Sequence, residues 1–264
     1  MAANENNNNF FLLKSIPVVL RARGFRLYTE GNRRLIDLWL NGGAAVLGHT
    51  PANMLRELKN TASRGLYAPF PHFTEGRFIK ALLKLFPGRY FRLYASPPPE
   101  LVSLFSAGKA CLWRPFCEPE KNAPPVFIPV LPGIQSWRGG LPLGLCVVAT
   151  ESEEQLAPLP PNDILSPILL VMAARGVYDL LASPLRAKPI LPKTFKALQK
   201  SRWKRHGVYL YLNESAQHEE WQALFRQFLE AGFLLPPCPS QPVILPGELS
   251  AGEDSKLAAV LSFG

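Results

Sequence analysis

The first third of the chain alternates short apolar runs with polar turns and then changes to helical spacing. Residues 25–28 and 35–40 are apolar-rich runs on either side of a turn signal at residues 30–32, which predicts a pair of strands. Farther on, apolar positions recur every three or four residues, the spacing of one helix face. This pattern predicts helices over residues 51–63 and 74–85, the second ended by a proline and a glycine.

The rest of the sequence predicts a further alternation of strands and helices. Expected strands cover residues 89–94, 126–130, 143–149, 207–212 and 242–245. Expected helices cover residues 100–110, 163–181, 193–202, 218–231 and 251–261. Asp163 is expected to cap or charge the first turn of its helix, and Ser250 with Glu253 has the pattern of a capping box. The alternation indicates an α/β architecture.

A glycine-rich loop follows the first strand pair. Gly42, Gly43 and Gly48 permit backbone angles that residues with a β-carbon resist. Asp37, near the end of the second apolar run, is expected to bond to the backbone of this loop. His49 precedes a helix start, and we interpret it as a hydrogen-bonding anchor of the loop in preference to a catalytic base.

Composition and charge narrow the possible classes of function. The chain has 264 residues, 47% of them hydrophobic, which is enough for a substantial core. Its formal charge is +9, with denser basic patches at residues 21–26 and 200–205. These patches are interpreted as solvated basic faces, because no nucleic-acid-binding motif accompanies them. Nucleic acid is therefore an unfavoured partner.

The cysteines and the apolar segments point to an intracellular protein. Cys111, Cys117, Cys146 and Cys238 lack metal-ligand spacing and are expected to be small, reduced core residues. The asparagine-rich residues 1–9 do not have the pattern of a secretory signal. No apolar run is long enough for a membrane span, so no membrane contact is expected, and the predicted compartment is the cytoplasm.

Three segments in order carry a resemblance to a known family. The segments are Gly24-Phe25-Arg26-Leu27-Tyr28, residues 30–38, and Leu47-Gly48-His49-Thr50-Pro51. Together they resemble class III aminotransferases, which are fold-type I enzymes dependent on pyridoxal phosphate (PLP) and include the glutamate-1-semialdehyde aminomutases. Residues 139–144 look like the glycine-rich turn of that family, and residues 207–263 resemble its terminal small domain.

The resemblance implies a shortened fold-type I architecture. Both ends of the chain would form the small domain, and a reduced large-domain sheet would lie between them. The expected divisions are a flexible tail (1–15), an amino-terminal aminotransferase-like segment (16–95), a large-domain remnant (96–190) and a carboxy-terminal small-domain segment (191–264). Relatives associate as dimers, so the resemblance also implies a homodimer or a heterodimer with a full-length aminotransferase.

The sequence departs from the family at the cofactor site. Gln135 stands where relatives have the lysine that forms a Schiff base with the cofactor, and an amide has no lone pair for that reaction. Ser96 is followed by three prolines in place of the loop whose N–H groups hold the phosphate. Ser96, Gln135, Gly139 and Gly140 therefore mark a degenerate pocket. No catalytic, cofactor-binding or metal residue is predicted.

Three hypotheses about function follow. The favoured one is a degenerate aminotransferase-like protein without Schiff-base catalysis and without a bound cofactor, which acts by binding or assembly. The alternative is an active or residual PLP-dependent aminotransferase, or a small-molecule binder, that uses a reshaped pocket. Lys109 and Lys121 were weighed as substitute lysines, but neither precedes a glycine turn. The second alternative is a nucleic-acid binder that uses the basic surface.

Overall fold

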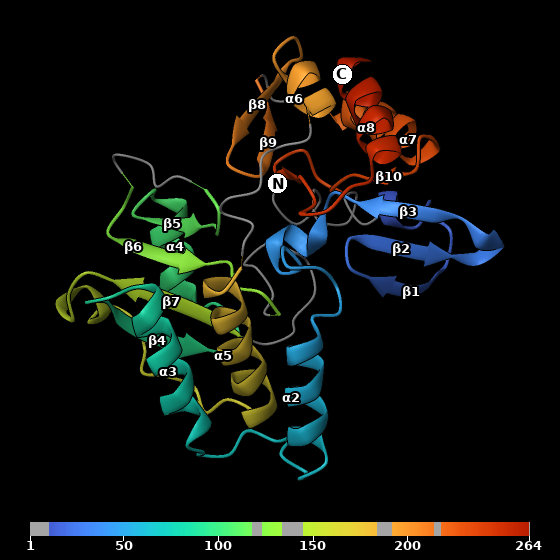
Figure 1. The fold of residues 1–264 in the computed structure, drawn as a ribbon. Coiled ribbons are helices and arrows are strands. Elements are labelled where there is room, and N and C mark those ends of the chain that lie inside the picture. Colours follow the sequence, from blue (N-terminus) through green and yellow to red (C-terminus); the bar gives the residue numbers. More distant parts are fainter. Residues whose placement is uncertain (1–10, 118–122, 134–144, 184–191, 214–217, 264) are drawn as a thin grey trace. The chain divides into compact units, whose positions relative to one another are not determined.

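The computed structural model describes residues 11–117, 123–133, 145–183, 192–213 and 218–263. These residues form two compact units, drawn in Figure 1. Unit 1 comprises the described residues of 1–42, 48–50 and 184–264, and unit 2 comprises those of 43–47 and 51–183. Unit 1 is thus built from both ends of the chain, as the sequence predicts.

Unit 1 contains two small sheets. The first has the order β1-β2-β3-β10, formed by β1 (Val19–Arg23), β2 (Arg26–Thr29), β3 (Arg34–Asp37) and β10 (Phe233–Leu234). The first three strands are antiparallel, and β10 is parallel to β3. The second sheet is antiparallel, with the order β11-β9-β8, formed by β8 (Trp203–His206), β9 (Tyr209–Leu212) and β11 (Val243–Ile244).

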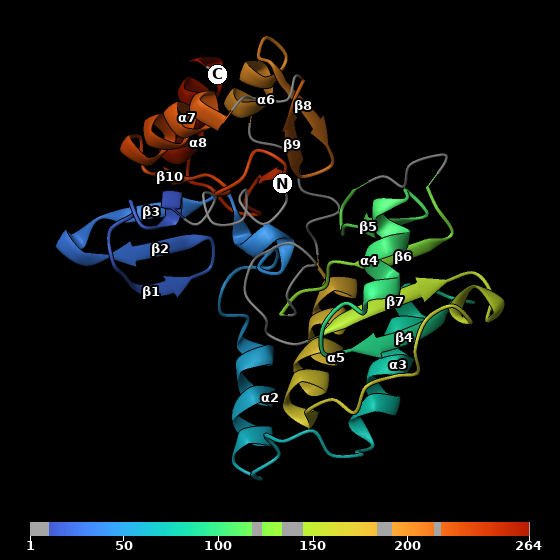
Figure 2. The same cartoon turned by 180° about the vertical axis from the view of Figure 1, so that it is seen from behind.

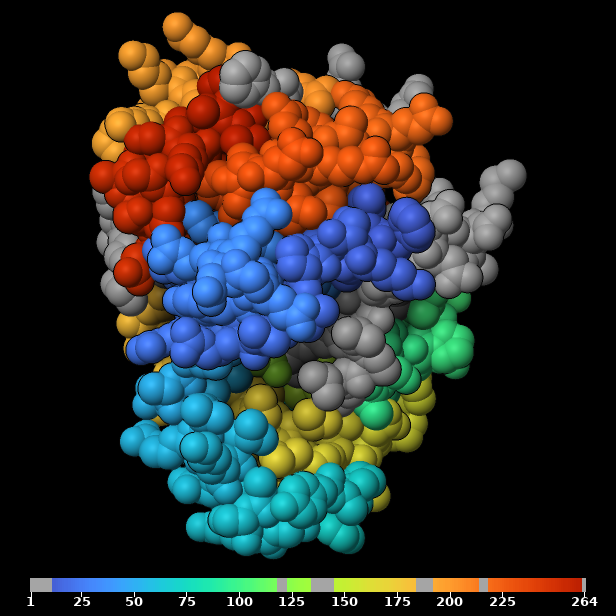
Figure 3. Space-filling model, turned by 90° about the vertical axis from the view of Figure 1, so that its right-hand side faces the viewer, coloured from blue at the N-terminus to red at the C-terminus, as the bar shows by residue number. Residues whose placement is uncertain are grey.

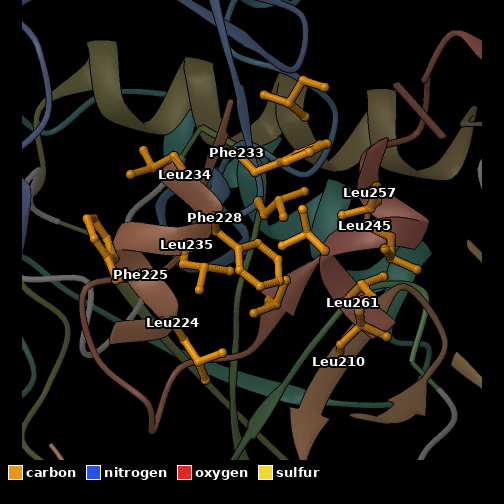
Figure 4. Packing of buried hydrophobic residues seen from close by; sticks show 14 of the residues in the cluster. Leu210, Leu224, Phe225, Phe228, Phe233, Leu234, Leu235, Leu245, Leu257 and Leu261 are labelled. Atoms are coloured by element: carbon orange, nitrogen blue, oxygen red, sulfur yellow. The ribbon is translucent and has the colours of Figure 1, made fainter. Parts of the chain in front are cut away.

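The helices of unit 1 complete its core. They are α6 (Pro192–Leu198), α7 (His218–Glu230) and α8 (Ala251–Phe263). Figure 4 shows Phe225 and Phe228 of α7 beside Phe233 of β10, with Leu257 and Leu261 of α8 in the same cluster. These side chains are almost fully buried. Each contributes about 1.5–3 kcal/mol relative to an exposed side chain, so residues from the end of the chain provide much of the core of unit 1.

Unit 2 is built around one sheet with the order β4-β7-β6-β5. Its strands are β4 (Tyr90–Tyr94), β5 (Ala110–Trp113), β6 (Val126–Pro129) and β7 (Cys146–Thr150). β7 is antiparallel to both of its neighbours, and β5 is parallel to β6. All five residues of β7 are buried, which is typical of a strand covered on both faces of its sheet.

Helices cover both faces of this sheet. They are α3 (Thr74–Leu85), α4 (Pro99–Ser106) and α5 (Pro167–Leu181), and α2 (Ala52–Ala62) packs against α5. Val147 and Ala149 of β7 pack with residues of α3 and α5, and both views show these two helices side by side (Figures 1 and 2). The alternate residues Cys146 and Val148 pack with Leu101 of α4 on the other face.

The strongly periodic elements match the sequence predictions. The helix expected over residues 74–85 has those bounds, and the helix over 218–231 ends one residue earlier, at Glu230. The capping box at the start of α8 is confirmed. The Ser250 hydroxyl accepts a hydrogen bond from the Glu253 N–H (3.2 Å), and the Glu253 carboxylate accepts one from the Ser250 N–H (2.8 Å).

Several predicted boundaries are wrong, and four of them are informative. The strand expected over residues 35–40 ends at Asp37, because the Asp37 side chain accepts the next backbone N–H groups. The helix expected over 163–181 begins at Pro167. The helices expected over 100–110 and 193–202 end at Ser106 and Leu198. In both of these places the remaining residues lead into short strands: β5, which pairs with β6, and β8, which forms a hairpin with β9.

Candidate functional site

The ends of three strands meet at one edge of the sheet in unit 2. Because β7 is antiparallel to β4 and β6, and β5 is parallel to β6, the three strands β4, β5 and β6 all run in one direction. Their carboxyl ends therefore share one edge, which we call the carboxyl edge and which is the usual place for ligands in such sheets. Ser96, which follows β4, lies at this edge and is exposed.

Asn162 and Asp163 hold the end of β4. The Asn162 side-chain oxygen accepts a hydrogen bond from the Leu93 N–H (3.1 Å), and the Asp163 carboxylate accepts one from the Ala95 N–H (2.8 Å). The Asp163 N–H in turn donates to the Leu93 carbonyl (2.9 Å). Asp163 thus does not cap α5, which corrects the sequence prediction. Sequence reasoning missed this role because the partners lie far apart along the chain.

Two ionisable side chains near the carboxyl edge are locked in their neutral forms. Tyr94 pairs in register with Cys146 on β7, and its hydroxyl donates to the Pro160 carbonyl (2.7 Å). Burial raises the pKa of Tyr94 to about 12, and burial also raises the pKa of the Cys146 thiol to about 12. Neither group supplies an anionic nucleophile near neutral pH, because the thiolate and not the thiol is reactive.

The start of α4 does not fit a phosphate group. An anion at a helix start is normally held by free backbone N–H groups. Here Pro98 is the N-cap residue and Pro99 begins the helix, and together with Pro97 they form three consecutive residues without an N–H donor. Glu100 adds a negative charge in the first turn. This segment therefore lacks three consecutive backbone donors and carries the wrong charge to hold the phosphate of PLP.

Of the two lysines considered as substitutes, the one that the structure describes, Lys109, does not lie at the carboxyl edge. Lys109 directly precedes β5, so it lies at the opposite edge of the sheet from Ser96. Lys121 lies outside the described residues, as do Gln135, Gly139 and Gly140, three of the predicted pocket positions. Of the four predicted pocket positions, the structure therefore describes only Ser96.

The chain is held tightly just before residue 134. The Gly133 N–H donates to the Ala44 carbonyl (2.9 Å), and a β-carbon on Gly133 would lie 1.8 Å from Met54 Cε. A β-carbon on Gly176 of α5 would lie 2.1 Å from the Pro132 carbonyl oxygen. The two glycines allow the backbone of residues 132–133 to approach α2 and α5 closely. The sequence signal for this was a glycine inside an otherwise apolar helix.

Asp37 and His49 form a closed pair in unit 1. Asp37 Oδ1 accepts hydrogen bonds from the N–H groups of Trp39 (2.8 Å) and Leu40 (2.9 Å), and its Oδ2 lies 2.8 Å from His49 Nε2. The His49 N–H donates to the Gly24 carbonyl (2.8 Å). Both residues thus anchor the glycine-rich loop, as the sequence predicts.

A second ionic cluster joins the two ends of the chain in unit 1. The Arg26 guanidinium donates two hydrogen bonds to the Glu253 carboxylate (2.7 and 3.0 Å), and Arg34 lies 3.3 Å from the same carboxylate. The bonds from Arg26 lower the pKa of Glu253 to about 2, with a further contribution from the Ser250 N–H. The sequence predicted the bond between Ser250 and Glu253 but not the arginines.

Neither a metal site nor a membrane-spanning helix is found in the part of the chain that the structure describes. No group of three or more histidine, cysteine, aspartate or glutamate side chains there could hold a metal ion. Among the same residues, no helix is both long and apolar enough to cross a lipid bilayer.

Comparisons with solved structures identify the fold. The structure is similar to ornithine δ-aminotransferase from Plasmodium falciparum, with a TM-score of 0.65 over 99% of this chain and 97% of that one, at 11% identity. It is similar to acetylornithine aminotransferase from Elizabethkingia anophelis, with a TM-score of 0.64 over 94% and 93% of the two chains, at 11% identity. The predicted fold is thus confirmed as a shortened form, 264 residues long, of the PLP-dependent aminotransferase architecture.

The sequence relatives carry no functional description. An uncharacterized protein of Treponema pallidum is 29% identical and matches 89% of this chain and 91% of its own length. An uncharacterized protein of Borreliella burgdorferi is 26% identical and matches 92% of this chain and 89% of its own length. No family model matches the chain. The comparisons therefore support the fold, and a function has to be argued from the residues.

Proposed function

We propose that this protein is a non-catalytic member of the aminotransferase fold, a pseudoenzyme that acts by binding or assembly. The observation that carries the proposal is the segment after β4. Pro97, Pro98 and Pro99 supply no N–H donor, and Glu100 brings a carboxylate to the place where the family holds the phosphate. A phosphate there would meet a negative charge and would lack the hydrogen bonds of three consecutive backbone N–H groups, so its hydration would be poorly replaced.

The amino-acid sequence supplies independent support. Gln135 replaces the lysine of the family, and a carboxamide cannot condense with an aldehyde. Lys109 cannot take over this role, because it lies at the edge of the sheet opposite to Ser96. The phosphate-holding segment and the covalent attachment point are thus lost together. PLP is accordingly not the cofactor of this protein.

Assembly with another polypeptide is the activity that remains. By its resemblance to dimeric relatives, the chain is proposed to form a homodimer, or a heterodimer with a full-length aminotransferase, in the cytoplasm. A regulatory or scaffolding protein needs the fold and its surfaces but not the cofactor chemistry.

The test of the cofactor claim is spectroscopic. Purified protein is incubated with PLP, an active aminotransferase serving as the positive control, and borohydride is then added before the protein mass is measured. We expect no visible absorption of a Schiff base and no increase in mass. A stable adduct on any lysine would refute the pseudoenzyme proposal.

A second candidate function, binding of a polyanion, is favoured by one observation. Residues 192–213 contain six lysines and arginines and no acidic residue, and two carboxylates that contact this segment are already engaged. Asp254 accepts hydrogen bonds from the backbone of α6, and Glu220 pairs with Arg202. Retention on heparin that persists above physiological salt and falls on replacement of Lys200 and Lys204 by glutamate would support it. Elution at low salt would mean that the retention on heparin reflects only nonspecific attraction to the basic surface.

A further inference from the structure

The connection between α2 and α3 carries three exposed aromatic rings. Tyr67 is 62% exposed, Phe70 50% and Phe73 72%. We call residues 65–73 the aromatic loop. Exposed apolar surface of this kind marks a place where a protein contacts another protein, a ligand or a membrane.

The aromatic loop is fixed in place by local contacts. Gly65, with φ of +72°, follows α2 and donates a hydrogen bond from its N–H to the Ala62 carbonyl (2.9 Å). At the other end, His72 Nδ1 lies 3.0 Å from the Thr74 hydroxyl and accepts a hydrogen bond from the Thr74 N–H (3.3 Å). The His72 and Phe73 rings are in contact, with their centroids 4.2 Å apart. Docking would therefore require little ordering of the chain, which favours association.

The aromatic loop has a firm support within unit 2. Phe78 and Leu82 of α3, the helix that follows the loop, are fully buried in one cluster with Leu170 and Val177 of α5. Figures 1 and 2 both show the loop running from the end of α2 to the start of α3, and in Figure 3 the cyan and teal atoms of this region lie at the surface. The exposed rings are thus carried by a packed layer of helices.

Three exposed cations lie on either side of the aromatic loop along the chain. Lys59 is in the last turn of α2, Arg64 directly precedes the loop, and Lys80 is in the second turn of α3. None of them forms an ion pair with a carboxylate of the described residues. We call these three cations the basic collar. Residues 65–73 themselves contain no lysine, arginine, aspartate or glutamate, so the charge begins where the aromatic surface ends.

The carboxylates of this region do not cancel the basic collar. Residues 55–80 contain five lysines and arginines and two acidic residues. The Glu57 carboxylate lies 3.4 Å from the Arg77 guanidinium, and the Glu75 carboxylate accepts a hydrogen bond from the Asn162 side-chain amide (3.4 Å). The region is therefore net positive, and both of its carboxylates are already engaged.

The order of these features matches the surface layers of an anionic lipid bilayer. Aromatic side chains are enriched at the boundary between the acyl chains and the headgroups. Lysine and arginine are attracted to the anionic headgroups, which lie just outside that boundary. Stacking of nucleic-acid bases would instead require cations among the rings, where the phosphates follow the bases, and the aromatic loop contains none. A neutral aromatic tip in front of a basic collar therefore favours a membrane as the partner.

We propose that the aromatic loop and the basic collar form a peripheral docking surface for anionic membranes. The three rings enter the boundary between headgroups and acyl chains, and the three cations contact the headgroups. Such contact requires no membrane-spanning helix, whereas the sequence expectation of no membrane contact is based on the length of apolar runs. A short loop with few cations gives reversible attachment. The inference goes beyond the proposed function and is independent of the cofactor claim, which has its own spectroscopic test.

Co-sedimentation of the full chain with lipid vesicles tests the proposal. The probes are vesicles of phosphatidylcholine alone and vesicles in which about 30% of the lipid is phosphatidylglycerol. We expect binding to the anionic vesicles to be about tenfold stronger or more, because each cation near an anionic surface contributes about a fivefold gain. High salt, about 1 M, is expected to remove most of this difference by screening. Equal binding to both kinds of vesicle, or binding to neither, would contradict the proposal.

The contribution of the rings is tested by combining Tyr67→Ser, Phe70→Ser and Phe73→Ser. This variant is expected to bind the anionic vesicles about tenfold more weakly, because membrane binding scales with the apolar area that is buried. The matched control replaces Val18 and Leu20, next to and within β1 of unit 1, by serine. These two residues are 59% and 68% exposed, and the control is expected to bind like the wild type. A loop variant that binds like the wild type, or a control that loses as much, would overturn the proposal.

The contribution of the basic collar is tested by combining Lys59→Glu and Arg64→Glu. This variant is expected to bind the anionic vesicles about tenfold more weakly or less. Arg226→Glu combined with Lys256→Glu is the matched control, because it makes the same change of charge at two exposed residues of unit 1. The control is expected to keep most of the binding, and equal losses would show that binding follows the total charge and not the collar. Circular dichroism checks that every variant is folded.

Lipids with brominated acyl chains locate the contact. Phe70→Trp adds a sixth tryptophan, in the aromatic loop, to the five of the chain. Bromine quenches only nearby rings, so we expect brominated vesicles to quench a larger fraction of the fluorescence of the bound variant than of the bound wild type. Equal fractional quenching would place another surface on the membrane and would refute docking through the loop.

Discussion

Unit 1 and unit 2 use their polar residues in different ways. In unit 1 the buried carboxylates are closed into local networks: Asp37 with two backbone amides and His49, and Asp254 with Thr194 and the Lys193 N–H. In unit 2 the carboxyl edge of the sheet begins with three prolines after Ser96 and offers few donors. The segments that resemble the aminotransferase family most closely are thus the ones that stabilise unit 1.

Fold and cofactor chemistry are often inferred together, and this difference between the two units separates them. The sequence similarity at residues 24–51 contains Asp37, Gly48 and His49, and in the structure these residues hold a loop to a sheet. They indicate the fold and give no evidence of cofactor chemistry. Ser96, the described position of the predicted pocket, lies in unit 2. Four changes would test or sharpen this comparison.

The largest expected effect is in unit 1, at Asp37. Asp37→Ala leaves two buried backbone N–H groups and His49 without their acceptor, and we expect a loss of about 4 kcal/mol in the free energy of unfolding. Asp37→Asn retains one acceptor oxygen and is expected to cost about half as much. Urea denaturation, with hydrogen exchange to localise the change to unit 1, measures both. A cost under about 1 kcal/mol for Asp37→Ala would show that the network is not important for stability.

The corresponding change in unit 2 is Gly176→Ala. A β-carbon there would lie 2.1 Å from the Pro132 carbonyl oxygen, so the backbone must shift, and we expect a loss of about 3 kcal/mol. Gly252→Ala in α8 is the matched control, because no atom lies within 4 Å of its β-carbon position. The control is expected to stabilise the protein by about 0.5–1 kcal/mol through helix propensity. Equal effects at the two glycines would rule out close packing at Pro132.

A smaller effect is expected at Glu253, and it depends on pH. The folded state lowers the pKa of Glu253 from 4.5 to about 2, so this group stabilises the fold fully above pH 4.5, and the contribution is lost as the pH falls toward 2. Glu253→Gln is expected to cost about 2 kcal/mol at pH 7.

The difference in unfolding free energy between wild type and Glu253→Gln, measured from pH 7 down to pH 2.5, checks this sign. We expect the difference to shrink as the pH falls below 4.5. A difference that stays constant over this range would mean that the Arg26 pair does not control the ionisation of Glu253.

No effect is expected from placing a lysine at residue 135, where the resemblance implies the lysine of the family. Gln135→Lys supplies an amine, but Pro97, Pro98 and Pro99 still offer no donors for the phosphate. We expect the variant to show no more visible absorption with PLP than an unrelated protein of equal lysine content. A saturable absorption band in the variant would mean that the prolines are no obstacle and that Gln135 alone prevents cofactor binding.

Elements with strong local signals could be predicted from the sequence. The helix over residues 74–85 has a clear apolar face, and the Ser250–Glu253 capping box depends only on neighbouring residues. The strands β5 and β8 were missed because their local sequence signals are weak. β8 consists of one buried tryptophan and three exposed polar residues, and it forms a strand only because β9 provides its hydrogen-bond partners.

The candidate site could be predicted only in part. The resemblance located Ser96, and the loss of donors after it is visible in the sequence because proline has no N–H. The roles of Asn162 and Asp163 at β4 depend on a tertiary contact, and a helix cap was the nearest local interpretation of an aspartate before an apolar run. The close approach of Gly176 to Pro132 likewise depends on how α5 is placed against the sheet.

The pairing of β3 with β10 has a consequence for synthesis of the chain. The strands β1, β2 and β3 are made before unit 2, yet the parallel partner of β3 is β10, and the core that covers these strands comes from α7 and α8. The described residues of 51–183, which belong to unit 2, leave the ribosome long before those helices do. These strands must therefore wait, with their apolar face uncovered, until α7 and α8 have been made, and a nascent chain is most exposed to aggregation in that interval.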